Sequence, residues 1–461
     1  MPARLLATLL LAVWALPAFV VPVRAQTAAI RSAEVVIPQN MHIPVPAGLK
    51  QLFPQGFVPG MGFGLNCAIA QSDGSMVLHT LTGRGPVLPG PTVQQGGAWT
   101  GSGLFVLPGY TPSILTLKLS GNKAELVGAI PLCDEGGKPV SGLPPAPTVT
   151  GAPVVVPLDL GLGRLPFAAT GFDPQGVAFD VKRGVYWIAD SYRPALLRVS
   201  PRDGRVLEVL AAGGDLEDLL ATHRPGWGFS GVSLSPVGKV HTMMRGVLFV
   251  NDVPAVFSRI IEYDPDSERV RQLAYPIDTE TFPDRARVVT GDPVAYADKK
   301  VLVLEQGIDK EGKPRSLVFA ADLSQGHNIS RVFNEEGKPT EILVEPAQWK
   351  AAGTRLVKKT LVLDLQASGF SEPFVESMTL LSDGRTLAFM SGHGFGLEGQ
   401  ISGYATNKDG TPGLNPASYM LADGKGLVYG DQPSKAVFGI RPTREVPRLW
   451  LVTLPKKVVD Y

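Results

Sequence analysis

The sequence predicts an all-β fold, a β-propeller of about six or seven blades with long loops between the blades. Short alternating runs recur along the chain, and a turn signal closes each one. The 52 glycines and 41 prolines among 461 residues supply many turns, and helical periodicity is scarce. Four-stranded units arranged radially fit this pattern and leave few free strand edges. A two-sheet sandwich with a second domain is the competing fold.

The N-terminal 25 residues have the pattern of a secretory signal peptide. Arg4 precedes an apolar run at residues 5–21, and small residues at Val23 and Ala25 mark a cleavage site. An uncleaved membrane anchor is the alternative, although Pro17 and Pro22 favour removal. We therefore expect an exported protein, periplasmic or extracellular, whose residues 26–461 form one domain with no membrane segment.

Strand-like runs follow in order along the chain. They lie at residues 75–81, 184–190, 247–253, 259–264, 300–306 and 386–392. Turn residues close each run, which is typical of antiparallel hairpins. Short helices are expected at 215–223 and 346–353. The Pro/Gly-rich segment 137–153 is either a linker or an excursion between blades.

Charge and cysteine content exclude some classes of binding partner and metal site. With 43 basic and 42 acidic residues, no overall field attracts nucleic acid or an anionic membrane. Cys67 and Cys133 are the only cysteines. Export would place them in an oxidising compartment, which favours a disulfide, and two free buried thiols are the alternative. Two cysteines without a nearby histidine pair do not make a zinc site.

Aromatic residues cluster near residues 186–229. Tyr186 and Trp187 are adjacent on an expected strand, so their side chains point to opposite faces and only one is expected in the core. Trp227 and Phe229 share a face, and we expect them to pack between blades, with stacking on a ligand as the alternative.

Generic catalytic motifs are missing. The sequence has no G-x-S-x-G, no Walker A loop and no H-E-x-x-H. A G-x-G-x-x-G occurs at Gly394, Gly396 and Gly399, but no helix is expected after it. This pattern therefore predicts a surface loop rather than dinucleotide binding.

An ordered set of segments nevertheless resembles a known family. The set comprises LTGRGP (81–86), PLCDEGGKPVSGLPP (131–145), GFDPQGVAFD (171–180), GVYWIADSYRPALLRVSPRDGRVL (184–207), PGWGFSGVSLSP (225–236), VTGDPVAYADKKVLVLEQG (289–307), SLVFAADLSQGHNIS (316–330) and VESMTLLSDGRTLAFMSGHGFG (375–396). Together they resemble the phytase-like family, also described by esterase-like activity of phytase, over residues 55–450. The resemblance implies an exported β-propeller that hydrolyses phosphate esters with a divalent cation, calcium.

The sequence departs from the family pattern at six positions where a carboxylate is expected. These are Gly83, Gln175, Ser191, Ser230, Gly392 and Gly394. Calcium needs six to eight oxygens and the charge of carboxylates, so either a weakened calcium site or no cofactor is expected. In another register of the resemblance, Asp180, Asp252 or Glu398 would supply a missing acid.

Five acids remain where the family motifs also have one: Asp173, Asp190, Asp292, Glu305 and Glu376. Asp173 and Asp190 are expected to cap turns at blade ends. We expect Asp292, Glu305 and Glu376 to line a site as metal ligands, with Asp292 and Glu305 as catalytic acid or base. Capping of turns is the alternative for these three as well.

Cations are found in the same segments. Arg84, Arg193 and Arg245, together with Gln175, are the candidate substrate-binding residues, because guanidinium groups bind phosphate with paired hydrogen bonds. A solvated arginine without a ligand is the alternative for each. His393, between two glycines, is a candidate catalytic proton donor, and His79 is a second histidine in these segments.

The sequence thus predicts a phosphoric ester hydrolase, or a protein that recognises phosphate esters, with a small phosphorylated ligand at one face of the propeller. The alternative is a non-catalytic propeller of the cell envelope that binds a small anion or a protein partner.

Overall fold

The computed structural model describes residues 28–461 except 96, 148–153, 334–336, 344, 393 and 423–425, and the side chains of 67–69 and 346. The expected signal peptide and the candidate His393 lie outside the described residues. Within the described part, no helix has the length and apolar character needed to cross a membrane.

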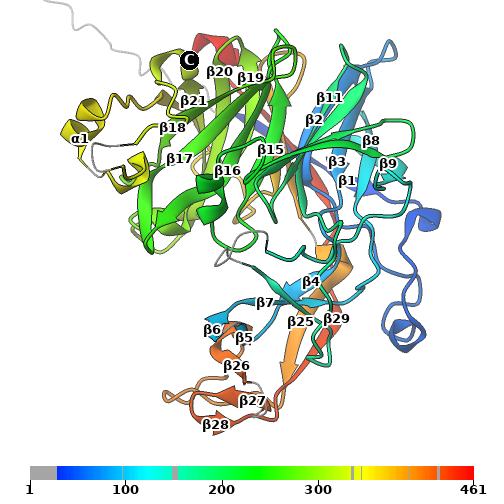
Figure 1. Ribbon diagram of the computed structural model, residues 1–461. Coiled ribbons are helices and arrows are strands. Elements are labelled where there is room, and N and C mark those ends of the chain that lie inside the picture. Colours follow the sequence, from blue (N-terminus) through cyan, green and yellow to red (C-terminus); the bar gives the residue numbers. More distant parts are fainter. Residues whose placement is uncertain are drawn as a thin grey trace, which may run out of the picture.

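Twenty strands form five antiparallel four-stranded blades (Figure 1). Blade 1 contains β2 (Phe63–Ala70), β3 (Met76–Leu81), β8 (Ser113–Ser120) and β9 (Lys123–Pro131). Blade 2 contains β11 (Pro174–Asp180), β12 (Val185–Asp190), β13 (Ala195–Val199) and β14 (Val206–Ala211). Blade 3 contains β15 (Phe229–Leu234), β16 (Val240–Val250), β17 (Val253–Asp264) and β18 (Arg269–Pro276). Blade 4 contains β19 (Val289–Ala297), β20 (Lys300–Ile308), β21 (Pro314–Asp322) and β22 (Lys358–Asp364).

The fifth blade joins the two ends of the chain. It contains β23 (Ser377–Leu380), β24 (Thr386–Ser391), β30 (Arg448–Thr453) and β1 (Ala29–Val36). β1 pairs antiparallel with β30, from Ala29 opposite Thr453 to Glu34 opposite Arg448. The end of β1 also pairs in parallel with β9 of blade 1. The strand nearest the N-terminus therefore closes the ring between the last blade and the first.

The inner strands meet around a common axis through glycines. β2, β11, β15, β19 and β23 contact one another in turn, and β23 contacts β2 again. A Cβ on Gly64 would lie 2.5 Å from the Cα of Gly176, one on Gly176 would lie 2.4 Å from the carbonyl carbon of Gly231, and one on Gly231 would lie 2.4 Å from the Cα of Asp292. Backbones this close leave no room for side chains. We call Gly64, Gly176 and Gly231 the glycine contact ring; together with the contacts of β23 to β19 and to β2, it shows radial closure of the fold.

The blade count is lower than expected. The described residues form five blades rather than about six or seven. Long segments between β3 and β8, between blades 1 and 2, and between β24 and β30 instead build a smaller lobe (Figure 1). In this lobe, β10 (Val156–Leu158), β7 (Ser102–Phe105) and β4 (Val87–Pro89) form one sheet. A second sheet contains β28 (Gln432–Pro433), β27 (Gly426–Tyr429), β26 (Tyr419–Ala422), β5 (Thr92–Gln95) and β6 (Ala98–Thr100), while β25 (Leu397–Ser402) pairs with β29 (Val437–Pro442). The prediction that residues 26–461 form one domain stays a prediction.

Helices are short, as the sequence predicts. The α-helix α1 (Pro346–Ala351) falls in the expected segment, and residues 215–223 contain the 3-10 helix η3 (Asp218–Thr222). The other 3-10 turns are η1 (Gln39–Met41), η2 (Ala47–Leu49), η4 (Arg285–Arg287), η5 (Leu323–Gln325), η6 (Thr340–Ile342), η7 (Gly394–Gly396), η8 (Pro416–Ser418) and η9 (Val458–Asp460).

The core lies between neighbouring blades, so both faces of a blade are buried. Trp187 packs with Phe229 and Ile261 between blades 2 and 3. Tyr186, on the opposite face of β12, packs with residues of blade 1 such as Leu81 and Ile114. The expectation that only one of Tyr186 and Trp187 is in the core is therefore wrong, because it assumed a sheet with one wet face.

The expected disulfide is not formed. Cys133 has a free thiol. Its segment follows β9 on the outer edge of blade 1, whereas Cys67 lies in β2 on the inner edge, with β3 and β8 between them. Three strand spacings amount to about 14 Å, well beyond the separation of about 7 Å that a disulfide can span.

Candidate functional site

A cavity of about 320 Å³ lies at one mouth of the propeller, where inner strands begin. Phe63 and Gln175 come from the starts of β2 and β11, while Trp227 and Glu376 precede β15 and β23. Leu88, Phe395 and Leu397, beside or within the smaller lobe, also line the cavity. The cavity thus collects side chains from four blades and from the lobe.

A chain of hydrogen bonds crosses this cavity. Arg84 donates from Nη1 to Oδ2 of Asp173 at 3.2 Å. Gln175 donates from Nε2 to the other oxygen of Asp173 at 2.8 Å. Arg245 donates from Nη1 to Oε1 of Gln175 at 2.6 Å. All four residues line the cavity, and we call them the Arg84–Arg245 chain.

A β-bulge places Gln175 in this chain. Pro174 pairs with Asp190 and Gly176 pairs with Ala189, so Gln175 is the extra residue on β11. Bulges redirect side chains at sheet edges and near functional sites. The amide of Gln175 has a donor for Asp173 and an acceptor for Arg245. A carboxylate in its place would keep the acceptor but would have no donor for Asp173.

The two arginines differ in how their charge is compensated. Arg84 forms an ion pair with Asp173, and its guanidinium lies 5.6 Å from the ring centre of Tyr192. Although burial opposes it, the Asp173 charge raises the pKa of Arg84. Among the described residues, the guanidinium of Arg245 makes one hydrogen bond, to the neutral amide of Gln175. Of these two arginines, Arg245 is therefore better able to bind an anionic ligand.

Asp190 supports the chain from behind. It is fully buried and accepts hydrogen bonds from the backbone N–H of Asp173 at 2.8 Å and of Tyr192 at 3.3 Å. Burial raises the pKa of Asp190 to about 7. Asp190 thus fixes the backbone of Asp173, as expected for a turn cap, whereas the Asp173 side chain points to Arg84 and Gln175.

Asp292 lies on the axis, next to the glycine contact ring rather than free in the cavity. Its φ of +43° is unusual for a residue with a side chain, and Oδ2 accepts a hydrogen bond from the backbone N–H of Met378 at 2.6 Å. Burial raises the pKa of Asp292 to about 8. A second cavity, of about 410 Å³, begins on the other side of this ring and includes Asp292 in its lining.

Glu305 is not brought to the cavity. Its side chain is completely buried between blades 3 and 4, where it accepts hydrogen bonds from the hydroxyl of Tyr275 at 2.6 Å and from the backbone N–H of Asp278 at 3.0 Å. Lys359 forms an ion pair with the same carboxylate. Burial raises the pKa of Glu305 and lowers that of Lys359.

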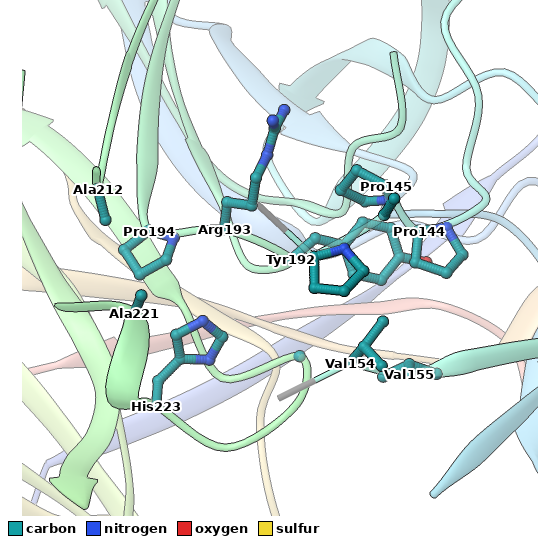
Figure 2. Close-up of a pocket in the computed structure, with 13 residues that line it drawn as sticks. Pro144, Pro145, Val154, Val155, Tyr192, Arg193, Pro194, Ala212, Ala221 and His223 are labelled. Carbon is teal, nitrogen blue, oxygen red and sulfur yellow. The ribbon is translucent and has the colours of Figure 1, made fainter. Parts of the chain in front are cut away.

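Arg193 lines a different, smaller cavity, with Tyr192 and His223 (Figure 2). Its guanidinium points away from His223 in this view and lies 5.8 Å from the ring centre of Phe172. His79 is also outside the mouth cavity: it is buried on β3, and its Nε2 lies 3.2 Å from the hydroxyl of Tyr186. Burial lowers the pKa of His79 to about 4.

The described residues do not fit a calcium site. No three His, Cys, Asp or Glu side chains among them are grouped so that they could hold a metal ion. Asp173 is held by Arg84 and Gln175, Glu305 is remote, and Asp180 and Glu398 form ion pairs with Arg183 and Arg441. A cation at the mouth would also face two guanidinium groups. The expected set of Asp292, Glu305 and Glu376 is therefore not assembled.

Two aromatic residues contribute to the cavity beyond the candidates for anion binding. Trp227 lines it, as in the alternative to packing between blades, while Phe229, two residues later, is buried in the core as expected. Phe395, with φ of +63°, comes from a loop that the sequence places in no strand. The positive φ of Gly226, beside Trp227, accompanies the turn that directs Trp227 to the mouth.

Comparisons with known proteins give one clear match. The family model named phytase-like, described as esterase-like activity of phytase, matches residues 108–391, more than half of the chain. No curated protein matches the sequence.

Solved structures show only distant similarity. Hydrazine synthase from Kuenenia stuttgartiensis is 11% identical, with a TM-score of 0.32, and the match covers 72% of this chain and 92% of that chain. A gluconolactonase from Xanthomonas campestris is 10% identical, with a TM-score of 0.27 and coverage of 87% and 98%. An α-L-arabinofuranosidase from Podospora anserina is 9% identical, with a TM-score of 0.34 and coverage of 94% and 98%. These scores are too low to bear on activity. From the ordered motifs, the radial strand order and the family match, the chain belongs to the phytase-like family, described by esterase-like activity of phytase.

Proposed function

We propose that this exported propeller recognises phosphate esters at its mouth cavity, with Arg245 as the principal anion-binding residue and Arg84 beside it. The observation that carries this proposal is the hydrogen bond from Arg245 to the neutral side chain of Gln175. A guanidinium has five N–H donors, and within the described part of the chain one of those on Arg245 is hydrogen-bonded, which leaves the others for phosphate oxygens. Arginine binds phosphate through paired, charge-assisted hydrogen bonds.

The chain around Arg245 supports this role by fixing its position. Gln175 is 8% exposed and Asp173 is 3% exposed, so the partners that hold the guanidinium are themselves immobilised by packing. A guanidinium held in place loses less conformational freedom when an anion binds. The site needs no metal ion for recognition.

Hydrolysis is a second candidate function, favoured by Glu376. This side chain is exposed and lines the same cavity as Arg245. As a general base, Glu376 would take a proton from a water molecule whose oxygen attacks phosphorus; the ester P–O bond would break, and the leaving oxygen would take up a proton from solvent to give the alcohol. Family membership is consistent with this hydrolase-type chemistry.

The test combines binding and turnover on the purified mature chain. Inorganic phosphate is titrated by calorimetry in the presence of EDTA, and 4-nitrophenyl phosphate turnover is followed with EDTA or with calcium. Saturable binding that is lost in Arg245→Gln but retained in Arg202→Gln, at an exposed position in the β13–β14 turn, is the expected result. Binding that requires calcium, or that survives Arg245→Gln, would overturn the proposal; binding without turnover would remove hydrolysis alone.

A further inference from the structure

A further cavity, of about 590 Å³, adjoins the mouth cavity. Arg245 and Glu376 line both of these cavities, so they stand where the two meet. Ile308 at the end of β20 and Phe374 before β23 also line the cavity of about 590 Å³, and they are 51% and 41% exposed. We call this cavity the side cleft.

We propose that the side cleft holds the organic group of the phosphate ester, and that this group is apolar, with an aromatic ring as its simplest form. The inference rests on the proposed function, since it takes Arg245 as the binding site of the phosphate. An ester whose phosphate contacts Arg245 extends naturally into the cavity that shares this residue. A volume of this size is typical of sites for small organic ligands.

The charges around the side cleft disfavour a ligand with several phosphates. Each phosphate group brings a charge of about −1.5 to −2 near neutral pH and needs its own basic partner. Among the described residues lining the side cleft, Arg287 is the only cation besides Arg245. Arg287 is already paired with Asp284 at 3.1 Å and is 81% exposed. Asp309 adds a further negative charge to the lining.

The apolar wall is held in a fixed position. Gln306, which is 7% exposed, donates from Nε2 to the carbonyl of Val375 at 2.9 Å and accepts from the backbone N–H of Val375 at 2.8 Å. Ser316 donates to the same Gln306 oxygen at 2.9 Å. This two-way contact ties the segment carrying Phe374 and Glu376 to blade 4. Exposed apolar side chains on a rigid wall gain free energy when a ligand covers them.

The experiment compares three probes by calorimetry in EDTA: inorganic phosphate, 1-naphthyl phosphate and myo-inositol hexakisphosphate. They are titrated into the wild-type chain and into Phe374→Ser and Ile308→Ser. Phe333→Ser is the matched control, because Phe333 is also exposed, at 51%, and lines neither cavity. Thermal unfolding of each variant checks that it is folded.

We expect 1-naphthyl phosphate to bind the wild-type chain about ten-fold or more tightly than phosphate, from the apolar area that it buries. Phe374→Ser and Ile308→Ser should each reduce this advantage several-fold without changing phosphate affinity, and Phe333→Ser should change neither. Equal affinity for phosphate and 1-naphthyl phosphate, or tightest binding of the hexakisphosphate, would overturn the inference while leaving phosphate recognition intact. Failure of every probe to bind would overturn the proposed function, and the inference with it.

Discussion

Arg245 on β16 donates a hydrogen bond to Oε1 of Gln175 on β11 at 2.6 Å, which joins blade 3 to blade 2 across the mouth of the propeller. The other end of the same amide donates to Asp173. The orientation of the Gln175 amide is therefore set from both sides. This explains an uncharged residue where related sequences are expected to have a carboxylate.

Replacing Gln175 by glutamate should weaken phosphate binding about ten-fold or more. The new carboxylate would form an ion pair with Arg245 and would lose the donor to Asp173, placing two negative charges side by side. Calorimetric titration of phosphate at neutral pH measures the change. Gln55→Glu, at an exposed position, is the control and should bind like the wild type; equal binding by Gln175→Glu would contradict the proposed role.

Replacing Gly231 by alanine should destabilise the fold by about 3 kcal/mol or more. Its φ is +73°, and a Cβ would lie 2.4 Å from the Cα of Asp292. Overpacking in a close-packed interior typically costs about 1–3 kcal/mol, and the left-handed backbone conformation adds about 1–2 kcal/mol for a residue with a Cβ. Gly312→Ala is the matched control, because φ is +78° there but nothing lies within 4 Å of the new Cβ.

Denaturant unfolding of the two alanine variants separates packing from backbone strain. Gly312→Ala should lose only the backbone part. If both variants lost the same stability, the close contact between β15 and β19 would not be an important part of the fold.

Replacing Glu305 by glutamine should reduce stability by about 3 kcal/mol and leave phosphate binding unchanged. The substitution leaves Lys359 without its charged partner, and breaking a buried ion pair in this way typically costs about 3–5 kcal/mol. Glu305 is separated from the mouth cavity by the packing between blades 3 and 4. Chemical unfolding and phosphate titration of the same preparation check the two outcomes.

The double variant Glu305→Gln with Lys359→Met should recover part of the lost stability, since no unpaired buried charge remains. Loss of phosphate binding or turnover in a Glu305→Gln protein that is still folded would instead support the catalytic or metal-binding role that the sequence suggests.

Asp292 should contribute a fall in the free energy of unfolding as pH rises from about 4 to about 8. The folded-state pKa of Asp292, about 8, exceeds its ordinary value of 3.8. The folded protein therefore binds more protons than the unfolded chain between these values, and rising pH favours unfolding. Asp292→Asn removes this proton, and Asn also tolerates the positive φ.

The slope of unfolding free energy against pH should thus be less negative in Asp292→Asn than in the wild type, by up to about 1.4 kcal/mol per pH unit. Asp190, with a pKa raised to about 7, and His79 and His223, each with a pKa lowered to about 4, contribute slopes of opposite sign in both proteins, so the difference between the two slopes reports Asp292. Urea unfolding at a series of pH values checks this. Identical slopes in the two proteins would show that Asp292 is not buried in its neutral form.

Most strands could be predicted from the sequence, whereas the number of blades that they form could not. Residues 300–306 lie in β20 and residues 386–391 form β24, because alternating apolar runs closed by turns are a local signal. The lobe is different: β5 pairs in parallel with β26, more than 300 residues later in the chain. Local patterns do not show which distant segments leave the blades and pair with each other.

The candidate site was predictable to the level of segments rather than side chains. Arg84, Gln175, Arg245 and Glu376 do meet at one cavity. Arg193 and Glu305 come from segments that resemble the family motifs equally well, but their side chains lie outside this cavity. Strand alternation tells which residues share a face of a blade, but both faces pack against neighbouring blades and the mouth lies at the ends of the inner strands, so alternation does not tell which side chains reach the mouth. The bulge at Gln175 adds a shift that the pattern does not reveal.

The most direct test of anion recognition at the mouth is a crystal structure of the mature chain soaked with phosphate in the presence of EDTA. Phosphate within hydrogen-bonding distance of the Arg245 guanidinium, with the bond from Arg245 to Gln175 intact and no metal ion beside it, is the result predicted here. A phosphate bound only through a metal ion, or an empty mouth cavity with phosphate bound elsewhere, would contradict it.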